Sequence, residues 1–231
     1  ASVQIGDLNL VNTLDKEQYD LMIIKLDGSG QPIWARVLGG TGFDYVHSMA
    51  CDGDNNLYFL GALSGAGLKF GDEIVSTKGQ RDVLVGSYTA NGNPRWIRRY
   101  GGDKHDAGHA MTVSADGDVY ITGSVQSLVV DFGGGLIEHI GSTELHDIFL
   151  VRLTSEGDHV WSHGYGGIDW DLSKSLALDE KENLYMVGSF ISPLIKLGGD
   201  PVAGGGSEAN KSEVFIAAYG LDGSHRWSQG M

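Results

Sequence analysis

Short apolar runs separated by turn-forming residues make up most of this chain. The segment Asp20–Leu26, an acid and the apolar run after it, is followed by the polar, glycine-containing segment Asp27–Gly30 and then by a second run, Pro32–Leu38. Short runs rich in β-branched and aromatic residues, bounded by glycine and aspartate, are typical of strands joined in β-hairpins. No stretch of about 11 residues or more keeps apolar residues at the spacing of a helix face, so no helix is expected.

A second kind of hairpin follows the first, and the two kinds alternate along the chain. In this second hairpin the apolar runs Val46–Cys51 and Leu57–Leu63 flank the turn Asp52–Asn56. Two consecutive antiparallel hairpins make a four-stranded sheet, which is the expected structural unit. Further copies of the two hairpins are Gly108–Ser114 with Val119–Val125, Asp147–Leu153 with His159–Tyr165, and Ser173–Leu178 with Leu184–Phe190.

Four of the five tryptophans mark a sequence repeat. Trp34, Trp96, Trp161 and Trp227 are 62, 65 and 66 residues apart, and Trp170 lies outside this series. Other residues recur at constant offsets from these tryptophans: an acid 14 residues before, a glycine four before, a Gly-Gly pair soon after, an aspartate ten after and a tyrosine 24 after. Constant offsets along the whole chain indicate a repeat architecture.

The repeat predicts an all-β fold, either a β-propeller or a propeller segment of four-stranded antiparallel blades. The chain holds about 3.5 repeats of 62–66 residues, taken here as a single domain of residues 1–231. The units run roughly over residues 1–64, 65–126, 127–190 and, incomplete, 191–231. A flat β-solenoid is the second architecture, although its repeats are usually much shorter. The repeated tryptophans and tyrosines are expected to fill the space between neighbouring sheets.

All variation in repeat length falls in one place, between the second hairpin and the next repeated acid. Insertions are tolerated where the backbone runs over the surface, so exposed loops or edge hairpins are expected here. These segments are Asp7–Tyr19, Asp72–Arg81, Gly134–His146 and Gly199–Ser212.

Composition narrows the functional classes. Glycine accounts for 36 of the 231 residues, roughly twice its usual share of about 7%, which fits a chain with many tight turns. The net charge of −14 argues against binding to nucleic acid or to an anionic membrane surface. No apolar stretch approaches about 18 residues, so no membrane insertion is expected. Cys51 is the only cysteine, so no intrachain disulfide can form, and it is expected to be a small buried core residue.

The candidate binding residues lie where each second hairpin begins. A basic residue stands three positions after each repeated aspartate, which gives the pairs Asp44 and His47, Asp106 and His109, and Asp171 and Lys174. A symmetric ring of such groups at the mouth of a central channel could hold an anionic group or a metal. The alternative is a local interaction within each pair that supports a turn.

The sequence contains no recognisable catalytic constellation. The remaining histidines lack the spacing of a zinc site, no nucleophile elbow occurs, and no cofactor is expected. The segment Asp52-x-Asp54-x-Asn56 resembles the start of a calcium loop, but the downstream acid is missing. A hairpin turn is therefore the preferred interpretation of this segment over a calcium site.

The units resemble the bacterial β-propeller repeat family often abbreviated SBBP. The resemblance rests on Asp147–Trp161, Gly166-Gly167, Asp171, Asn183–Tyr185 and Gly188, and on Phe132-Gly133-Gly134 in the preceding unit, and it covers essentially the whole chain. It implies a module of secreted or cell-surface bacterial proteins that acts as a scaffold for adhesion or recognition. The fourth unit departs from the pattern, because Glu213 replaces the aspartate and the unit stops at Met231.

The chain holds four Trp hairpins but three hairpins of the second kind, and an open propeller would expose strand edges. Three arrangements would resolve this. The two ends of the chain could complete a mixed blade, two or more copies could close a ring as a homo-oligomer, or the chain could be a fragment of a longer array.

These features favour a non-enzymatic module, extracellular or on the bacterial cell surface, that binds a glycan or protein ligand through its loops or channel mouth. One alternative is a structural spacer in a longer surface protein. Another is a propeller lyase or hydrolase, which would require non-repeated polar residues to converge at the channel mouth.

Overall fold

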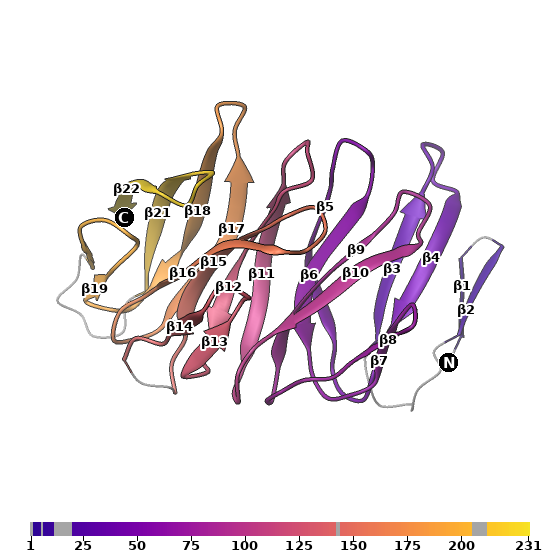
Figure 1. Cartoon of the computed structure of the whole chain (residues 1–231), viewed down its shortest axis with the longest axis horizontal. Helices are drawn as coiled ribbons and strands as arrows, with labels where there is room; N and C mark the ends of the chain where they lie inside the picture. Colours follow the sequence, from indigo (N-terminus) through magenta and orange to yellow (C-terminus); the bar gives the residue numbers. More distant parts are fainter. Residues whose placement is uncertain (1, 6, 12–19, 142–143, 205–211) are drawn as a thin grey trace.

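The computed structural model shows an all-β protein, as the sequence predicts (Figure 1). It describes residues 2–5, 7–11, 20–141, 144–204 and 212–231, and every regular element within these ranges is a strand. The same ranges contain no helix long and apolar enough to cross a membrane.

Three four-stranded antiparallel sheets contain most of the described strands. In each sheet an inner hairpin, the second kind seen in the sequence, pairs with the Trp hairpin that follows it. The first sheet consists of β5 (Tyr45–Cys51), β6 (Leu57–Leu63), β9 (Asp82–Tyr88) and β10 (Pro94–Tyr100). The second consists of β11 (Asp106–Val113), β12 (Val119–Val125), β15 (Asp147–Leu153) and β16 (His159–Tyr165). The third consists of β17 (Asp171–Leu178), β18 (Asn183–Phe190), β21 (Glu213–Gly220) and β22 (His225–Gly230).

The remaining strands form two-stranded hairpins. The first Trp hairpin, β3 (Leu21–Leu26) and β4 (Pro32–Leu38), is a sheet of its own. Small hairpins place their second strands where repeat length varies, which confirms the prediction of edge hairpins there in part, because their first strands precede the predicted segments. They are β1 (Ser2–Ile5) with β2 (Leu8–Val11), β7 (Leu68–Phe70) with β8 (Glu73–Val75), β13 (Val129–Asp131) with β14 (Leu136–Glu138), and β19 (Leu194–Ile195) with β20 (Val202–Ala203). Residues 12–19, 142–143 and 205–211 of the predicted loops lie outside the described residues.

The sheets do not coincide with the units expected from the sequence. The first sheet spans residues 45–100, so it takes its inner hairpin from the unit 1–64 and its Trp hairpin from the unit 65–126. The cause is the antiparallel pairing of β6 with β9, from Leu57↔Tyr88 to Leu63↔Asp82. Because each inner hairpin pairs forward along the chain, the first Trp hairpin has no inner hairpin beside it.

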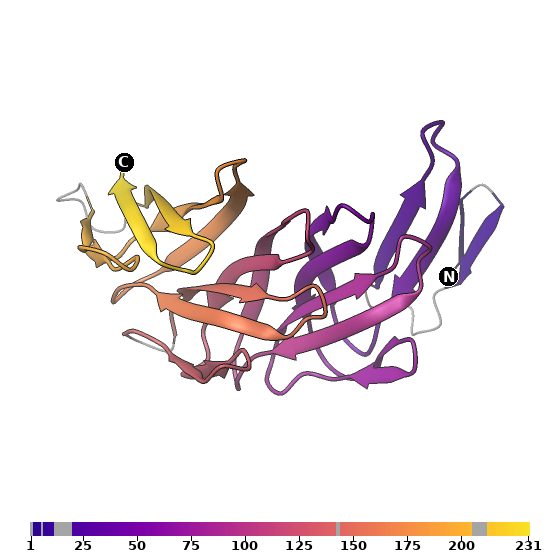
Figure 2. The same ribbon diagram turned by 45° about the horizontal axis from the view of Figure 1, so that its top comes forward.

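The sheets stand side by side in a curved row whose two ends are apart (Figures 1 and 2). The innermost strand of the second sheet, β11, lies between β5 and β17. The first Trp hairpin, with β1–β2 beyond it against β4, lies at one end of the row and the third sheet at the other, so the described parts of the two chain ends do not share a sheet.

A separate hydrophobic core lies between each pair of neighbours in the row. Repeated aromatic residues are central to these cores: Tyr58 and Tyr120 are fully buried, and Trp34 and Trp96 nearly so. Each core buries residues from two adjacent sheets, which is the arrangement that large aromatic side chains stabilise. The prediction that the repeated aromatics fill the space between sheets is confirmed at these positions.

Each of the first three repeated tryptophans also binds the next sheet through a hydrogen bond to a hairpin turn. The donors and acceptors are Trp34 Nε1 with Ala90 O (3.1 Å), Trp96 Nε1 with Ser155 O (2.8 Å), and Trp161 Nε1 with Leu221 O (2.9 Å). The repeated glycine lies in the same turn. At Gly92 the φ angle is +76°, and an added Cβ would come within 2.7 Å of the Trp34 indole. Glycine is therefore required both by the backbone and by the ring that packs on it.

The expectation that Cys51 is buried is wrong, because its side chain is exposed. Cys51 lies on β5, the innermost strand of the first sheet. On this side the first sheet faces the first Trp hairpin, and that hairpin has no inner hairpin that could cover β5. Cys51 instead borders a groove of about 240 Å³ that Ile24, Leu26 and Met49 also line.

Candidate functional site

The three repeated aspartates are buried and serve the fold. Asp44 accepts hydrogen bonds from Gly40 N at 3.1 Å and from Ser64 N at 3.0 Å. Asp106 does the same with Gly102 N, Gln126 N and Ser127 N, and Asp171 with Gly167 N and the Ser192 hydroxyl. Each carboxylate therefore ties the Gly-Gly turn to the segment that leaves the inner hairpin.

Burial also decides how these acids titrate. It raises the pKa of Asp44, although the hydrogen bonds from Ser64 and Gly40 work in the opposite direction. It raises the pKa of Asp171 to about 6, again against the bonds that the carboxylate accepts. Shifted acids are common at catalytic sites. Here, however, both side chains are sealed, with 2% and 0% of their surface exposed, so neither can meet a substrate without unfolding its turn.

The basic residues three positions later do not pair with these aspartates. His47 Nδ1 contacts Gly108 O at 2.7 Å, and His109 Nδ1 contacts Ser173 O at 2.9 Å, each on the next inner strand. Because a carbonyl oxygen can only accept, each Nδ1 carries the proton of its hydrogen bond. The expected local Asp–His interaction is thus replaced by a bond between sheets, and Lys174 stands exposed on the last inner strand.

His109 is the most enclosed of these three basic side chains. Burial lowers its pKa to about 4, even though the bond to Ser173 favours the charged form and Lys174 and His47 add smaller effects. The imidazole is therefore neutral at pH 7, and its bare Nε2 accepts the Ser124 hydroxyl at 3.3 Å. The positions of His47, His109 and Lys174 therefore do not supply three cations at pH 7, because His109 carries no charge.

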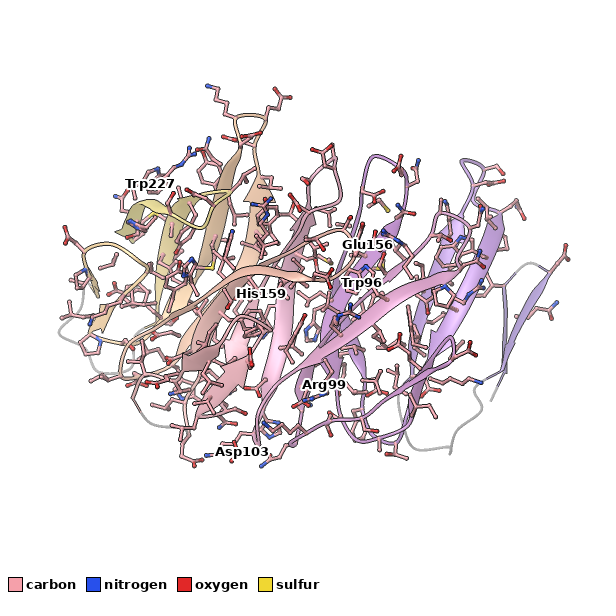
Figure 3. All side chains as sticks on the ribbon, viewed as in Figure 1. Trp96, Arg99, Asp103, Glu156, His159 and Trp227 are labelled. Carbon is pink, nitrogen blue, oxygen red and sulfur yellow. The ribbon has the colours of Figure 1, made fainter. Side chains whose placement is uncertain are left out.

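Exposed rings stand at the lower end of the inner strands, just before the buried aspartates. We call Phe43, His105 and Trp170 the inner rim. Phe43 is 43% and Trp170 40% exposed, and His105 is also exposed. Figure 3 places Asp103, two residues before His105, at this lower edge. Because β5, β11 and β17 are neighbours, the three rings share one edge of the row.

The backbone holds two of these rings firmly in place. His105 is flanked by the bonds Asp106 N to Arg81 O (2.9 Å) and Gln126 N to His105 O (3.0 Å). Trp170 is flanked by the equivalent bonds, Asp171 N to His146 O (2.9 Å) and Ile191 N to Trp170 O (2.9 Å). A side chain presented from a bonded backbone loses little conformational entropy when it binds a ligand.

Polar and charged groups lie beside the inner rim. The His146 ring packs against Trp170 with the centroids 4.7 Å apart, and burial lowers the pKa of His146. The Arg81 guanidinium lies 5.3 Å from the centre of the Tyr45 ring. Flat apolar surfaces, the His146 imidazole and the Arg81 guanidinium therefore lie along this edge of a chain that is strongly acidic overall.

The sequence contained a signal for this rim that a search for identical residues misses. Phe43, His105 and Trp170 each stand nine residues after a repeated tryptophan. The three residues differ, but all carry a ring. Trp170, which lies outside the tryptophan repeat, belongs to this second series.

The upper edge of the row has a different character. A pocket of about 560 Å³ lies between the turns of the second and third sheets, and most of its polar lining is acidic. Its one arginine, Arg152, already binds Asp118 at 2.6 Å and the Leu221 carbonyl at 3.0 Å. Within the described residues, no three His, Cys, Asp or Glu side chains are grouped so as to hold a metal ion.

The segment that resembles a calcium loop is a closed hairpin turn. Asp52 accepts from the backbone amides of Asp54 and Asn56, from the Asn56 side chain, and from the Tyr58 hydroxyl at 3.0 Å. Asp179 accepts the same four bonds in the third sheet. These bonds account for Asp52 with Tyr58 and for Asp179 with Tyr185 without a cation.

Comparison with known proteins gives no family for this chain. No family model and no curated protein matches it. Among solved structures, it is similar to a protein of unknown function from Bacteroides caccae, at 6% identity and a TM-score of 0.30, over 92% of this chain and 94% of that one.

Proposed function

We propose that this chain is a non-enzymatic binding module that recognises an extracellular glycan or protein ligand through the inner rim. The observation that carries the proposal is the exposure of a ring at the same repeat position, just before each of three neighbouring inner strands. Exposed aromatic side chains cost free energy in water, and they concentrate where a ligand will cover them. Phe, Trp and His bring large contact areas with few rotatable bonds.

The small hairpins support the same function. β7–β8, β13–β14 and β19–β20 lie toward the lower edge in Figure 1, as the rim does. They differ in length between repeats and carry exposed apolar residues, such as Ile74 (73%) and Leu136 (66%). Segments that vary on a rigid repeat scaffold are suited to selecting a ligand.

We further propose that the row of sheets is a segment of a β-propeller. Its support is the strand order, in which each four-stranded sheet runs from an inner strand of the row to an outer Trp strand. The resemblance to SBBP-type repeats supports an extracellular or cell-surface location in bacteria. An acidic, repeat-built module with a ring-lined edge fits adhesion or recognition at such a surface.

A binding role is favoured over a lyase or hydrolase by the state of the titratable groups. The aspartates with raised pKa are enclosed and bonded to backbone amides, whereas a general acid or base must reach the reacting atom. The spacer alternative assigns no purpose to the rim, and it predicts that removing a rim ring changes nothing except local packing.

The test is binding of the fluorescently labelled chain to a printed glycan array and to a panel of purified surface proteins. We expect selective binding to one of the two, and a loss of at least about tenfold in affinity for Trp170→Ala, since burying one aromatic ring is worth over about 1.4 kcal/mol. Val160→Ala is the control, because Val160 is 41% exposed on the outer strand β16, away from the rim. Absence of binding in both formats, or equal binding by Trp170→Ala, would overturn the proposal.

A further inference from the structure

The junctions between neighbouring sheets show which contacts cover the face of a sheet inside the row. At every internal junction a tryptophan donates to the turn of the next Trp hairpin and packs on the glycine of that turn. Trp96 shows the contact in Figure 3, where it lies beside Glu156 of the next turn. Apolar side chains of the two sheets complete the junction, and Val83 and Leu84 are fully buried on the two faces of the first sheet.

The third sheet presents the donor half of this junction to solvent. Trp227 is 44% exposed, whereas Trp96 is 4% exposed. It nevertheless holds the usual pose, because its ring lies 6.3 Å from Tyr185, just as Trp161 lies 6.3 Å from Tyr120. Farther along β21, Val214 is 48% exposed, although its counterpart Ile148 in the second sheet is fully buried.

The first Trp hairpin presents the acceptor half. Gly30 has a φ of +83°, close to the +76° of Gly92, so its turn has the shape that receives an indole. No atom lies within 4 Å of the position of an added Cβ at Gly30, whereas Gly92 is covered by Trp34. On the same face Met22 and Leu26 are 47% and 50% exposed, and their counterparts Leu84 and Tyr88 are 0% and 2% exposed.

We infer that the Trp227 face of one copy of this chain docks on the Gly28–Gly30 turn of a second copy. The two faces carry the donor tryptophan and the acceptor turn of a junction that the chain builds three times internally, so a second copy brings the half that each face lacks. The carbonyl of Gly28 stands six residues before Trp34, as Ala90 stands six before Trp96, and it would accept the Trp227 Nε1 proton.

The two faces differ, so the contact is head to tail rather than two-fold. Such a contact leaves one free face at each end of a dimer, and association continues until a ring closes or a filament grows. The missing inner hairpin of the first half-sheet makes this contact smaller than an internal junction. We therefore expect association that depends on concentration, independent of any ligand of the inner rim.

The test uses two variants that each remove one face. Trp227→Ala removes the donor ring, and Gly28→Tyr fills the space that the ring would take. Gly28 tolerates a side chain because its φ lies outside the positive range and no atom lies within 4 Å of its added Cβ. Two substitutions of the same kinds serve as controls. Trp170→Ala removes a ring from the inner rim, and Lys181→Tyr adds a ring to an exposed upper turn. Thermal unfolding of each variant establishes that it is folded.

Sedimentation velocity over a wide range of concentrations gives the answer. We expect the mass of the wild-type chain and of both controls to rise with concentration, and each of the two variants to remain a monomer of 24.7 kDa. An equal mixture of the two variants should form a dimer that does not grow, because one variant keeps only the acceptor face and the other only the donor face. A wild-type chain that is monomeric throughout, variants that associate like wild type, or a mixture without dimers would overturn the inference.

Discussion

At the scale of single residues, the glycine four positions before a repeated tryptophan can be required for two reasons: its backbone conformation, and the space that it leaves for a packed indole. Gly30 and Gly92 both have positive φ, at +83° and +76°, so both would strain any residue with a Cβ. Gly92 is also covered by the Trp34 indole, whereas Gly30 has no atom within 4 Å of an added Cβ. The pair separates the backbone requirement from the packing requirement.

We predict that Gly92→Ala destabilises the protein more than Gly30→Ala. Both variants place alanine at positive φ, at a cost of about 1–2 kcal/mol. Gly92→Ala must in addition displace the Trp34 ring from a 2.7 Å contact, which adds about 1–3 kcal/mol. Urea unfolding followed by tryptophan fluorescence measures the difference. Equal losses in the two variants would show that the indole does not depend on the glycine.

A second prediction at this scale concerns the proton on Asp147. Burial raises the pKa of this carboxyl to about 7, and Asp171 adds to the effect, while the bond from Ile140 N opposes it. His139 Nδ1 lies 3.5 Å away. Because the folded pKa exceeds the unfolded value of 3.8, the contribution to stability is complete below that value and is lost as the pH rises through about 7.

Asp147→Asn should therefore be stabilised relative to wild type at about pH 8 and not at about pH 4. One pKa unit corresponds to about 1.4 kcal/mol, so the stability of Asp147→Asn relative to wild type should change by a few kcal/mol between the two pH values. Thermal unfolding of both proteins across this range is the measurement, with Asp103→Asn as the control for loss of one exposed charge. A constant difference between Asp147→Asn and wild type at all pH values would contradict the prediction.

At the scale of elements, the same strand meets different neighbours at the two ends of the row. Met49 on β5 and Met111 on β11 occupy equivalent positions, 15 residues after a repeated tryptophan. Met111 is 6% exposed because the first sheet covers it, and Met49 is 53% exposed because no inner hairpin stands before it. The environment, and not the local sequence, decides which methionine stabilises the fold.

We predict that Met111→Ala costs about 2–5 kcal/mol and Met49→Ala less than about 0.5 kcal/mol. Chemical denaturation of the two variants provides the comparison, and the chemically identical substitution is its own control. A substantial loss in Met49→Ala would mean that another segment covers β5 in solution.

The same contrast shows which elements a sequence reveals. Strands and turns were predictable, because alternating runs bounded by Asp and Gly, such as Leu21–Leu26 before Asp27-Gly28, determine local structure. The exposure of Cys51 was not, because its pattern matches that of half-buried Val113 and only the missing neighbour distinguishes them. The hydrogen bond of His47 to Gly108 joins residues 61 positions apart, and no local spacing in the sequence predicts it. The inner rim could be predicted from the constant offset of its residues from the repeated tryptophans, but only when Phe, His and Trp are treated as one class.

For the whole molecule, stability should vary along the row, because each sheet contacts only its neighbours. In such arrays the free energy is close to a sum of unit stabilities and junction terms. The second sheet has a junction on both sides, and its strand β12 is buried at all seven residues and paired with β11 and β15. The first Trp hairpin has two strands, one junction with a four-stranded sheet, only the small hairpin β1–β2 against β4 on its other side, and the exposed Met22 and Leu26.

Local opening should therefore begin at the first Trp hairpin. We predict that the amides of β3 and β4 exchange with deuterium at least about tenfold faster than those of β12. The measurement is hydrogen exchange read by mass spectrometry on the Trp227→Ala variant, in which head-to-tail contacts cannot cover the hairpin. The wild-type chain at high concentration is the comparison, and there the docked Trp227 face should slow exchange in β3 and β4 while leaving β12 unchanged. Equal protection of the hairpin and β12 in the variant would mean that the row opens as a single cooperative unit and that its end junction is as strong as those inside it.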